Sequence, residues 1–266
     1  MDIKINLDKN VEENAQIYFE KAKKSKRKLE GAKKALQETK KKLEKQQKTH
    51  EKTKEKAEAI KKAKERKKEW HEKFKWFKSS DNILIIAGKD ASTNELIIKK
   101  HTEPWNLVFH TEAPGSPFVV IKNEKEQEIP ETTKKEAATF AGTNTKAWER
   151  NISSIDVFEV KPEQVTKETK SGEYIAKGSF MIYGKRIIHD VVLDMSIGYY
   201  TKNEHKIVMA GPTTAIKKHC EDYITLKQGN LKKGEISNKI VQKLKLATNE
   251  EVLSALPQGR YDFKKK

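Results

Sequence analysis

The chain has 266 residues, one cysteine (Cys220) and a formal net charge of +17, so it has room for one ordinary domain plus an extended element. A lone cysteine excludes a disulfide within the chain, and no apolar stretch reaches the roughly 20 residues that a membrane span needs. Residues 1–10 lack the basic start and apolar core of a signal peptide. We therefore expect a cytoplasmic protein.

The positive charge is concentrated in one segment. Between Lys21 and Lys78, 25 Lys and Arg residues stand against nine Glu and no Asp, so this segment alone carries +16. Basicity confined to one element indicates a polyanionic partner, and nucleic acid is the first choice. An acidic protein, a membrane surface and a merely solvated face are the alternatives.

We predict an N-terminal extension at residues 1–9, followed by a basic helical arm at residues 10–78. Asn10 and Glu13 have the spacing of an N-cap residue and its capping-box partner. The arm contains no proline and one glycine, Gly31, so a helix is favoured over most of its length.

Apolar and small residues recur along the arm at intervals of four and three, which is the spacing of a coiled-coil seam. They are Val11, Ala15, Tyr18, Ala22, Ser25, Leu29, Ala32, Leu36, Thr39 and Leu43. The pattern lapses after Leu43 and resumes at Ile60. We therefore predict an antiparallel coiled-coil hairpin with its tip at residues 46–54; the alternative is one continuous helix that dimerises.

Residues 79–230 change character to short apolar, β-branched runs separated by turn residues, which predicts a mostly antiparallel sheet with packed helices. The expected strands are 83–87, 96–98, 107–110, 118–121, 155–160, 179–183, 187–193, 199–201, 206–209 and 223–226. Helices are expected at 131–148 and 212–220. Residues 231–266 are predicted to form a short C-terminal helical tail, with helices at 236–246 and 250–256. The fold class is α+β.

No residue pattern predicts catalysis. The seven histidines show no paired spacing on a helix face, and Cys220 has no second cysteine to share a zinc ion. Residues 178–186 have one residue too many between their glycines for a phosphate-binding loop, and no Gly-x-Ser-x-Gly elbow is present. We expect no enzymatic activity, no cofactor and no metal.

The basic clusters of the arm lack matching acidic partners, which favours phosphate contacts that read charge and shape. The arm residues assigned to RNA binding are Lys40, Lys41, Lys42, Lys45, Lys48, Lys52, Lys54, Lys56, Arg66, Lys67 and Lys68. Four aromatic residues close the arm: Trp70, Phe74, Trp76 and Phe77. We predict that these rings pack the base of the arm onto the domain; stacking on exposed bases is the alternative.

The segment WHEKFKWF at residues 70–77 resembles the start of the RNA-binding domain of the NFACT family of ribosome quality-control factors, in its archaeal type. Further pieces follow in the family's order: SSDN at 79–82, GKD at 88–90, NE at 94–95, His110 with Gly115, VIKN at 120–123, QVTK at 164–167, SGEYI at 171–175, and GSFMI at 178–182 with GK at 184–185. Residues 14–21 resemble the start of the family's coiled coil. Glu112 to Gly115 departs from the family's Asp-x-His-Gly.

The resemblance implies a module that binds tRNA and the large ribosomal subunit on stalled complexes, in support of mRNA-independent C-terminal tailing of nascent chains. The domain residues assigned to RNA are Lys89, Asp90, Asn94, His110, Lys122, Asn123, Gln164, Lys167, Tyr174, Lys177, Ser179, Lys185 and Arg186. Gly172, Gly178 and Gly184 are expected to serve special turns or close backbone approach.

The family's N-terminal domain has no counterpart in the sequence, so we expect tailing to need a separate N-terminal NFACT chain. A general nucleic-acid-binding adaptor whose coiled-coil tip binds a protein partner is the first alternative. A metal-dependent hydrolase acting on RNA is the second.

Overall fold

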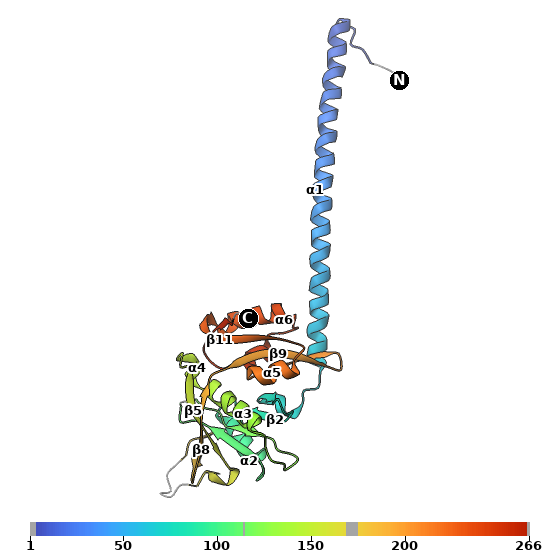
Figure 1. Cartoon of the computed structure of the whole chain (residues 1–266). Coiled ribbons are helices and arrows are strands. Elements are labelled where there is room, and N and C mark those ends of the chain that lie inside the picture. Colours follow the sequence, from blue (N-terminus) through green and yellow to red (C-terminus); the bar gives the residue numbers. More distant parts are fainter. Residues whose placement is uncertain (1–3, 114, 169–174, 265–266) are drawn as a thin grey trace. The chain divides into compact units, whose positions relative to one another are not determined.

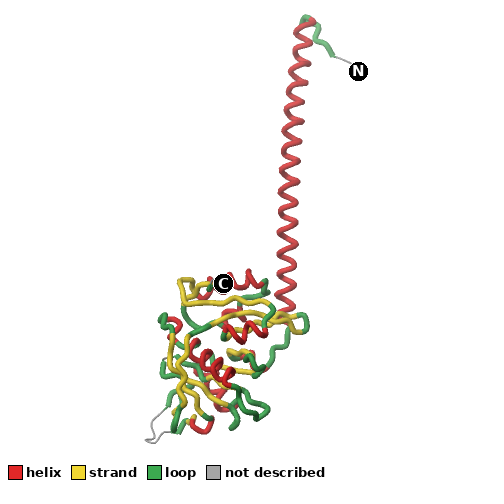
Figure 2. The backbone as a smooth tube through the Cα atoms, viewed as in Figure 1, coloured by secondary structure: helices red, strands yellow, loops and turns green. Residues whose placement is uncertain are grey.

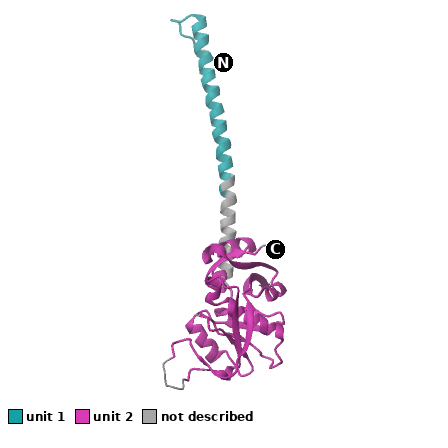
Figure 3. Cartoon of the chain, turned by 60° about the vertical axis from the view of Figure 1, so that its left-hand side comes forward, with its two compact units in different colours: residues 1–59 teal, residues 60–266 magenta. Residues whose placement is uncertain are grey.

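The computed structural model describes residues 4–113, 115–168 and 175–264, with the backbone alone described at residues 44, 45 and 47–65. The chain divides into two compact units, Met1–Ala59 and Ile60–Lys266 (Figure 3). Among the described residues, no helix combines the length and apolar character needed to cross a membrane.

Helix α1 (Val11–Glu65) supplies most of the first unit (Figure 2). The predicted capping box is confirmed: Asn10 Oδ1 accepts a hydrogen bond from the Glu13 N–H at 2.8 Å, and Glu13 Oε2 accepts one from the Asn10 N–H at 3.1 Å. The extension folds back onto the first turns, where the Tyr18 hydroxyl donates to the Lys4 carbonyl at 2.6 Å.

The predicted hairpin is wrong, because α1 runs without a break through residues 46–54. This stretch contains no Gly or Pro and is rich in Lys, Glu and Gln, which propagate a helix well. A lapse in the apolar seam removes packing contacts but leaves the backbone hydrogen bonds of the helix intact. The seam is exposed: Leu29, Leu36 and Leu43 are 57%, 59% and 54% accessible. Dimerisation of the continuous helix stays a prediction.

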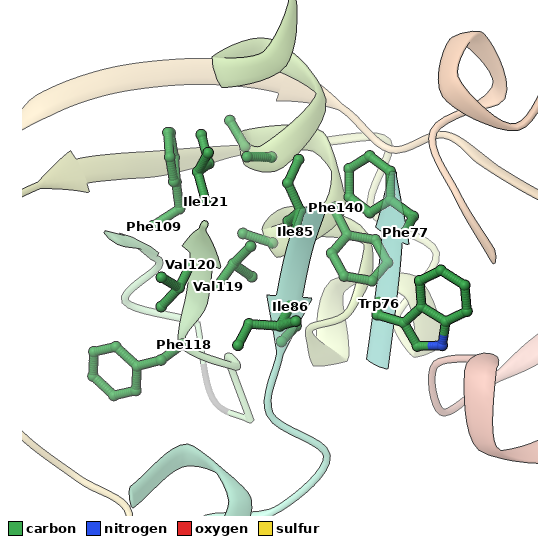
Figure 4. Packing of buried hydrophobic residues seen from close by; sticks show 14 of the residues in the cluster. Trp76, Phe77, Ile85, Ile86, Phe109, Phe118, Val119, Val120, Ile121 and Phe140 are labelled. Carbon is green, nitrogen blue, oxygen red and sulfur yellow. The ribbon is translucent and has the colours of Figure 1, made fainter. Parts of the chain in front are cut away.

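A six-stranded antiparallel sheet with strand order β1-β2-β4-β3-β5-β8 forms the first core of the second unit (Figure 1). Its strands are β1 (Lys75–Lys78), β2 (Leu84–Ala87), β3 (Leu107–His110), β4 (Val119–Ile121), β5 (Ser154–Val160) and β8 (Ile187–Val192). Helix α3 (Glu131–Thr143) packs against β3, β4, β5 and β8. In β2 and β4 consecutive side chains are buried, so both faces of the sheet are covered there. In this core the rings of Phe77 and Phe140 lie 4.8 Å apart (Figure 4).

A four-stranded antiparallel sheet with strand order β10-β9-β11-β12 forms the second core. Its strands are β9 (Met195–Lys202), β10 (His205–Gly211), β11 (Asp222–Lys232) and β12 (Arg260–Phe263), and its helices are α4 (Lys146–Glu149), α6 (Lys233–Leu244) and α7 (Glu250–Ala255). Helix α5 (Thr213–His219) packs against strands of both sheets, and its buried Ala215 and Ile216 belong to the first core. The predicted C-terminal tail is part of this core: β12 completes the sheet, and Tyr261 is fully buried beside Trp148, at 5.6 Å between rings.

One predicted strand is a helix. Residues 96–98 lie in α2 (Ala91–Lys100), because Asp90 caps this segment by accepting the Thr93 N–H at 2.8 Å. The cap starts a helix that the short apolar run alone does not reveal. The remaining elements are η1 (Trp70–Lys73), η2 (Pro162–Gln164), β6 (Val165–Thr166) and β7 (Met181–Ile182).

Residues 66–78, which we assigned to the arm, lie in the second unit after α1 has ended. Packing of the aromatic cluster is confirmed for Phe74, Trp76 and Phe77, which are 1%, 7% and 0% exposed. Trp70 is 43% exposed and stacks on the His101 ring at 4.8 Å. The cluster therefore belongs to the core of the domain.

Candidate nucleic-acid interface

A groove of about 1020 Å³ lies within the second unit. It receives residues from strands of the first sheet and from helices α6 and α7 of the second core. Its charged lining is Lys75, Lys89, Asp90, Glu112, Lys146, Glu149, Lys177, Arg186 and Lys233. Six cations against three carboxylates make this a positively charged concavity, which suits a polyanionic ligand.

Aromatic side chains occupy one end of the groove. The His110 ring stacks on Phe118 with 4.1 Å between centroids, and the Arg186 guanidinium lies 4.7 Å from the centre of the Phe158 ring. Phe158 pairs with His110 across β5 and β3, so both project from the same face of the sheet. Phe180 meets Phe118 edge-on at 5.4 Å. Phe118 and Phe158 are only 2% and 7% exposed, so the half-buried rings of His110 and Phe180 are the ones that a base can reach.

The His110 ring is held by polar contacts at Nδ1. Burial lowers the pKa of its imidazole below the usual value. Its Nδ1 lies 3.0 Å from the Pro117 carbonyl oxygen and 3.1 Å from Ser116 Oγ. Because a carbonyl only accepts, an Nδ1–H is the form that donates to Pro117.

The segment that carries Lys177 and Ser179 into the groove is positioned by a tight glycine turn. Gly178 has φ +79°, and a Cβ there would lie 2.4 Å from the Ala91 Cα. Its N–H donates to Glu95 Oε2 at 3.2 Å. Glu95 also accepts hydrogen bonds from Lys99 and Lys167, which lower the pKa of its carboxyl to about 2. The predicted special turn at Gly178 is therefore confirmed; Gly184, with φ +85°, is a second one.

Lysines occupy the other end of the groove. Lys75 Nζ donates to Asn144 Oδ1 at 2.6 Å. Burial, and then the nearby charges of Lys233 and Lys89, lower the pKa of Lys75 to about 7. The groove therefore joins a cationic end to an aromatic end, the two kinds of contact that single-stranded nucleic acid makes with proteins.

Known proteins share this part of the chain. Residues 73–184 match the family described as the NFACT protein RNA binding domain. Over 199 residues the chain is 38% identical to the archaeal Rqc2 homolog aRqcH of Methanocaldococcus jannaschii, an alignment that covers 74% of this chain and 29% of that relative. The chain belongs to the NFACT family.

Two eukaryotic relatives match a shorter part of this NFACT chain. The ribosome quality control complex subunit NEMF homolog of Drosophila melanogaster is 43% identical over 115 residues, covering 43% of this chain and 12% of the relative. The ribosome quality control complex subunit NEMF of Homo sapiens is 41% identical over 115 residues, covering 43% and 11%. The chain thus spans less than a third of the length of these three relatives.

The structure brings seven of the domain residues predicted for RNA binding together in the groove lining. They are Lys89, Asp90, Asn94, His110, Lys177, Ser179 and Arg186. Asp90 also caps α2, and Asn94 Oδ1 accepts the Phe118 N–H at 3.1 Å, so both residues shape the wall of the groove. Arg186 donates to the exposed Glu112 at 3.0 Å, a weak surface pair that a phosphate can displace.

The other predicted domain residues do not line this groove. Lys122 donates to the His101 carbonyl at 2.8 Å, Asn123 donates to the Gln127 carbonyl at 2.7 Å, and Gln164 donates to the carbonyls of Tyr183 and Lys185 at 2.8 Å each. These three side chains hold turns and strand ends together. Lys167 pairs with Glu95, Lys185 is exposed outside the groove, and Tyr174 lies outside the described residues.

Along α1, Lys40, Lys41 and Lys42 are exposed. The side chains of Lys45, Lys48, Lys52, Lys54 and Lys56 lie outside the described residues. Lys67 and Lys68 are also exposed, in the turn that follows α1.

Arg66 is engaged by carboxylates of its own domain, and its assignment to RNA stays a prediction. Its guanidinium makes paired hydrogen bonds with Glu72 at 2.7 and 2.5 Å and a third bond with Glu251 at 2.9 Å. These carboxylates raise the pKa of Arg66, and its side chain is only 8% exposed. With three hydrogen bonds to two carboxylates, Arg66 links the end of α1 to Glu72 and to α7.

Sequence reasoning missed three groove lysines: Lys75, Lys146 and Lys233. The predicted bounds place Lys75 in the arm and Lys233 in the helical tail. No local pattern separates them from other lysines, because the groove is built from segments that lie far apart in the sequence. Among the described residues, no cluster of His, Cys, Asp and Glu is arranged to hold a metal ion.

Proposed function

We propose that this NFACT chain is the RNA-binding module of a ribosome quality-control factor, and that it binds tRNA and the large ribosomal subunit on stalled complexes in support of mRNA-independent tailing. The observation that carries the proposal is the groove, which combines lysine and arginine side chains with stacked aromatic rings. Relatives that bear ribosome quality control names support the cellular setting.

The groove suits unpaired nucleotides more than a duplex. Phosphates can meet Lys177 and Arg186 at its rim, while bases can reach the half-buried rings of His110 and Phe180. In a duplex the bases are already stacked on one another, so the aromatic end would have nothing to receive. A single-stranded tRNA end or a loop is the form of RNA that fits both ends.

The lysines of α1 suit a different contact. They lie along one helix without matching carboxylates, which gives strong but nonspecific attraction to phosphates. Binding of this kind releases counterions and weakens steeply as salt rises. We propose that α1 engages ribosomal RNA and that the groove engages tRNA.

Co-sedimentation with purified large and small ribosomal subunits across a salt series tests the proposal. The arm variant carries Lys40→Glu, Lys41→Glu and Lys42→Glu, and the matched control carries a single reversal at the exposed Lys217 of α5. We expect saturable binding that favours the large subunit, and a loss of at least tenfold in the arm variant. Equal binding to both subunits, or full binding by the arm variant, would sink the ribosomal role.

The second candidate is an adaptor that binds a protein partner through α1. The exposed seam favours it, because Leu29, Leu36 and Leu43 lie on one helix face with most of their surface in solvent. Pairing with a second helix would bury them. Sedimentation of the chain alone and with candidate partners separates this function from RNA binding by α1.

A further inference from the structure

Lys75 is half-buried, and among the described residues no carboxylate pairs with its ammonium group. Its ammonium donates to the neutral Asn144 side chain, whose own amide is oriented by a hydrogen bond to the Phe140 carbonyl at 2.9 Å. The charges that act on it are those of Lys233 and Lys89, and both oppose its protonated form. A withdrawn ammonium without a counter-ion is costly for a protein to retain.

Two further lysines face the same end of the groove from other segments. Lys89 follows β2, and its Nζ lies 3.4 Å from the Glu72 carbonyl oxygen. Lys233 is the first residue of α6, where the helix terminus adds partial positive charge. Burial lowers the pKa of both side chains.

The acidic groups around this end are engaged elsewhere or face Lys89. The charges of Asp90 and Glu72 raise the pKa of Lys89, whereas the charge of Lys68 lowers it. Glu72 is already paired with Arg66. Glu250 and Glu251 of α7 line an adjoining pocket with Lys75 and Lys89, and Glu251 accepts a hydrogen bond from Arg66. The charges that shift the pKa of Lys75, Lys89 and Lys233 do not include those of Glu149, Glu250 or Glu251. The cationic end therefore has a surplus of charge that a bound anion can balance.

We propose that Lys75, Lys89 and Lys233 form a phosphate-binding site that holds one backbone phosphodiester of single-stranded RNA, with the strand continuing along the groove toward Arg186. The inference rests on the proposed RNA-binding function and names the chemical group that this site takes. It also makes binding proton-coupled, because a phosphate stabilises the charged form of Lys75. RNA binding then takes up a proton when the free protein is above about pH 7.

Fluorescence anisotropy of the full chain with a labelled single-stranded RNA oligonucleotide tests the site. The variants are Lys75→Met and Lys233→Ala, and the matched control is Lys239→Ala, an exposed lysine on the same helix as Lys233. We expect each groove variant to bind roughly tenfold more weakly, with a salt dependence reduced by about 0.7 in log–log slope. The control stays within twofold of the wild type.

The pH dependence gives a second readout. Wild-type affinity falls several-fold from pH 6.5 to 8.5, whereas Lys75→Arg, which stays charged, shows a flatter profile over that range. An unchanged profile in Lys75→Arg would contradict the role of Lys75.

A probe without RNA keeps the two proposals apart. Inorganic phosphate, compared with chloride at equal ionic strength, is expected to raise the thermal midpoint of the wild type and of Lys239→Ala, but not of Lys75→Met or Lys233→Ala. If the chain binds RNA and the groove variants bind it equally well, the phosphate site is overturned and the RNA function stands. If phosphate stabilises through these lysines and RNA does not bind, the anion site stands and the proposed function fails.

Discussion

Arg66→Ala is the substitution for which the structure makes the sharpest stability prediction. The Arg66 and Glu72 side chains are 8% and 7% exposed, and two hydrogen bonds of 2.7 and 2.5 Å join them. Removing the guanidinium leaves the Glu72 carboxylate withdrawn from water, with the Glu69 N–H at 2.8 Å as a remaining donor.

Loss of one partner of a buried ion pair costs about 3–5 kcal/mol. Glu251 adds little to this figure, because its side chain is 25% exposed and can be resolvated. For a domain of this size each kcal/mol lowers the melting temperature by about 2–4 °C, so we expect a fall of about 10 °C. The control is Lys67→Ala, at an exposed residue next to Arg66, which should leave the melting temperature unchanged.

Thermal unfolding followed by tryptophan fluorescence measures the effect, since Trp76 is buried in the same unit. The double variant Arg66→Ala with Glu72→Gln should be more stable than the sum of the single changes predicts, because it removes the orphaned charge. A melting temperature of Arg66→Ala within 2 °C of the wild type would refute a structural role. At a temperature below both melting temperatures, RNA binding by Arg66→Ala should depend on salt with the same slope as RNA binding by the wild type.

Two further predictions concern the groove. Gly178→Ala should destabilise the domain by about 2–4 kcal/mol in urea titrations and weaken RNA binding, because the φ of Gly178 is positive and the new Cβ would overlap Ala91. Gly234→Ala is the control, because a Cβ at that position meets open space. Equal stability of the two variants would contradict the role of the turn. Since the folded-state pKa of Lys75 is about 7 and its ordinary value is 10.5, the unfolded chain binds the extra proton between these values. Stability conferred through Lys75 therefore rises with pH over that range, by as much as about 5 kcal/mol. Lys75→Met should thus exceed the wild type most at pH 7 and below; a stability difference that does not change between pH 6.5 and 9.5 would disprove the linkage.

Local sequence signals predicted the helix start, most strands and the α+β class. Asn10 and Glu13 are three residues apart, so their capping box needs no other part of the chain. The same kind of signal stands at Asp90 and Thr93, and the strand prediction for residues 96–98 takes no account of it. Because apolar runs of three or four residues suit a strand or a helix equally, only the cap could decide that segment.

The hairpin shows where a seam pattern is insufficient. A repeat of apolar residues indicates that a helix can pair with another helix, but it does not say whether that helix belongs to the same chain. Helix α1 continues through the residues predicted to form the turn. Turns need residues that stop a helix, and residues 46–54 have none.

By itself the sequence determined the segregation of positive charge, the family motifs and the residue types that suit RNA. Only the tertiary structure decided which cations are available to a ligand. Arg66 forms an ion pair with Glu72. Lys75 and Lys233 come from opposite ends of the domain and lie close enough for the charge of Lys233 to lower the pKa of Lys75. A side chain's charge is a property of its residue. Its partners and its exposure to water depend on segments far along the chain, and those determine whether that charge is available to a ligand.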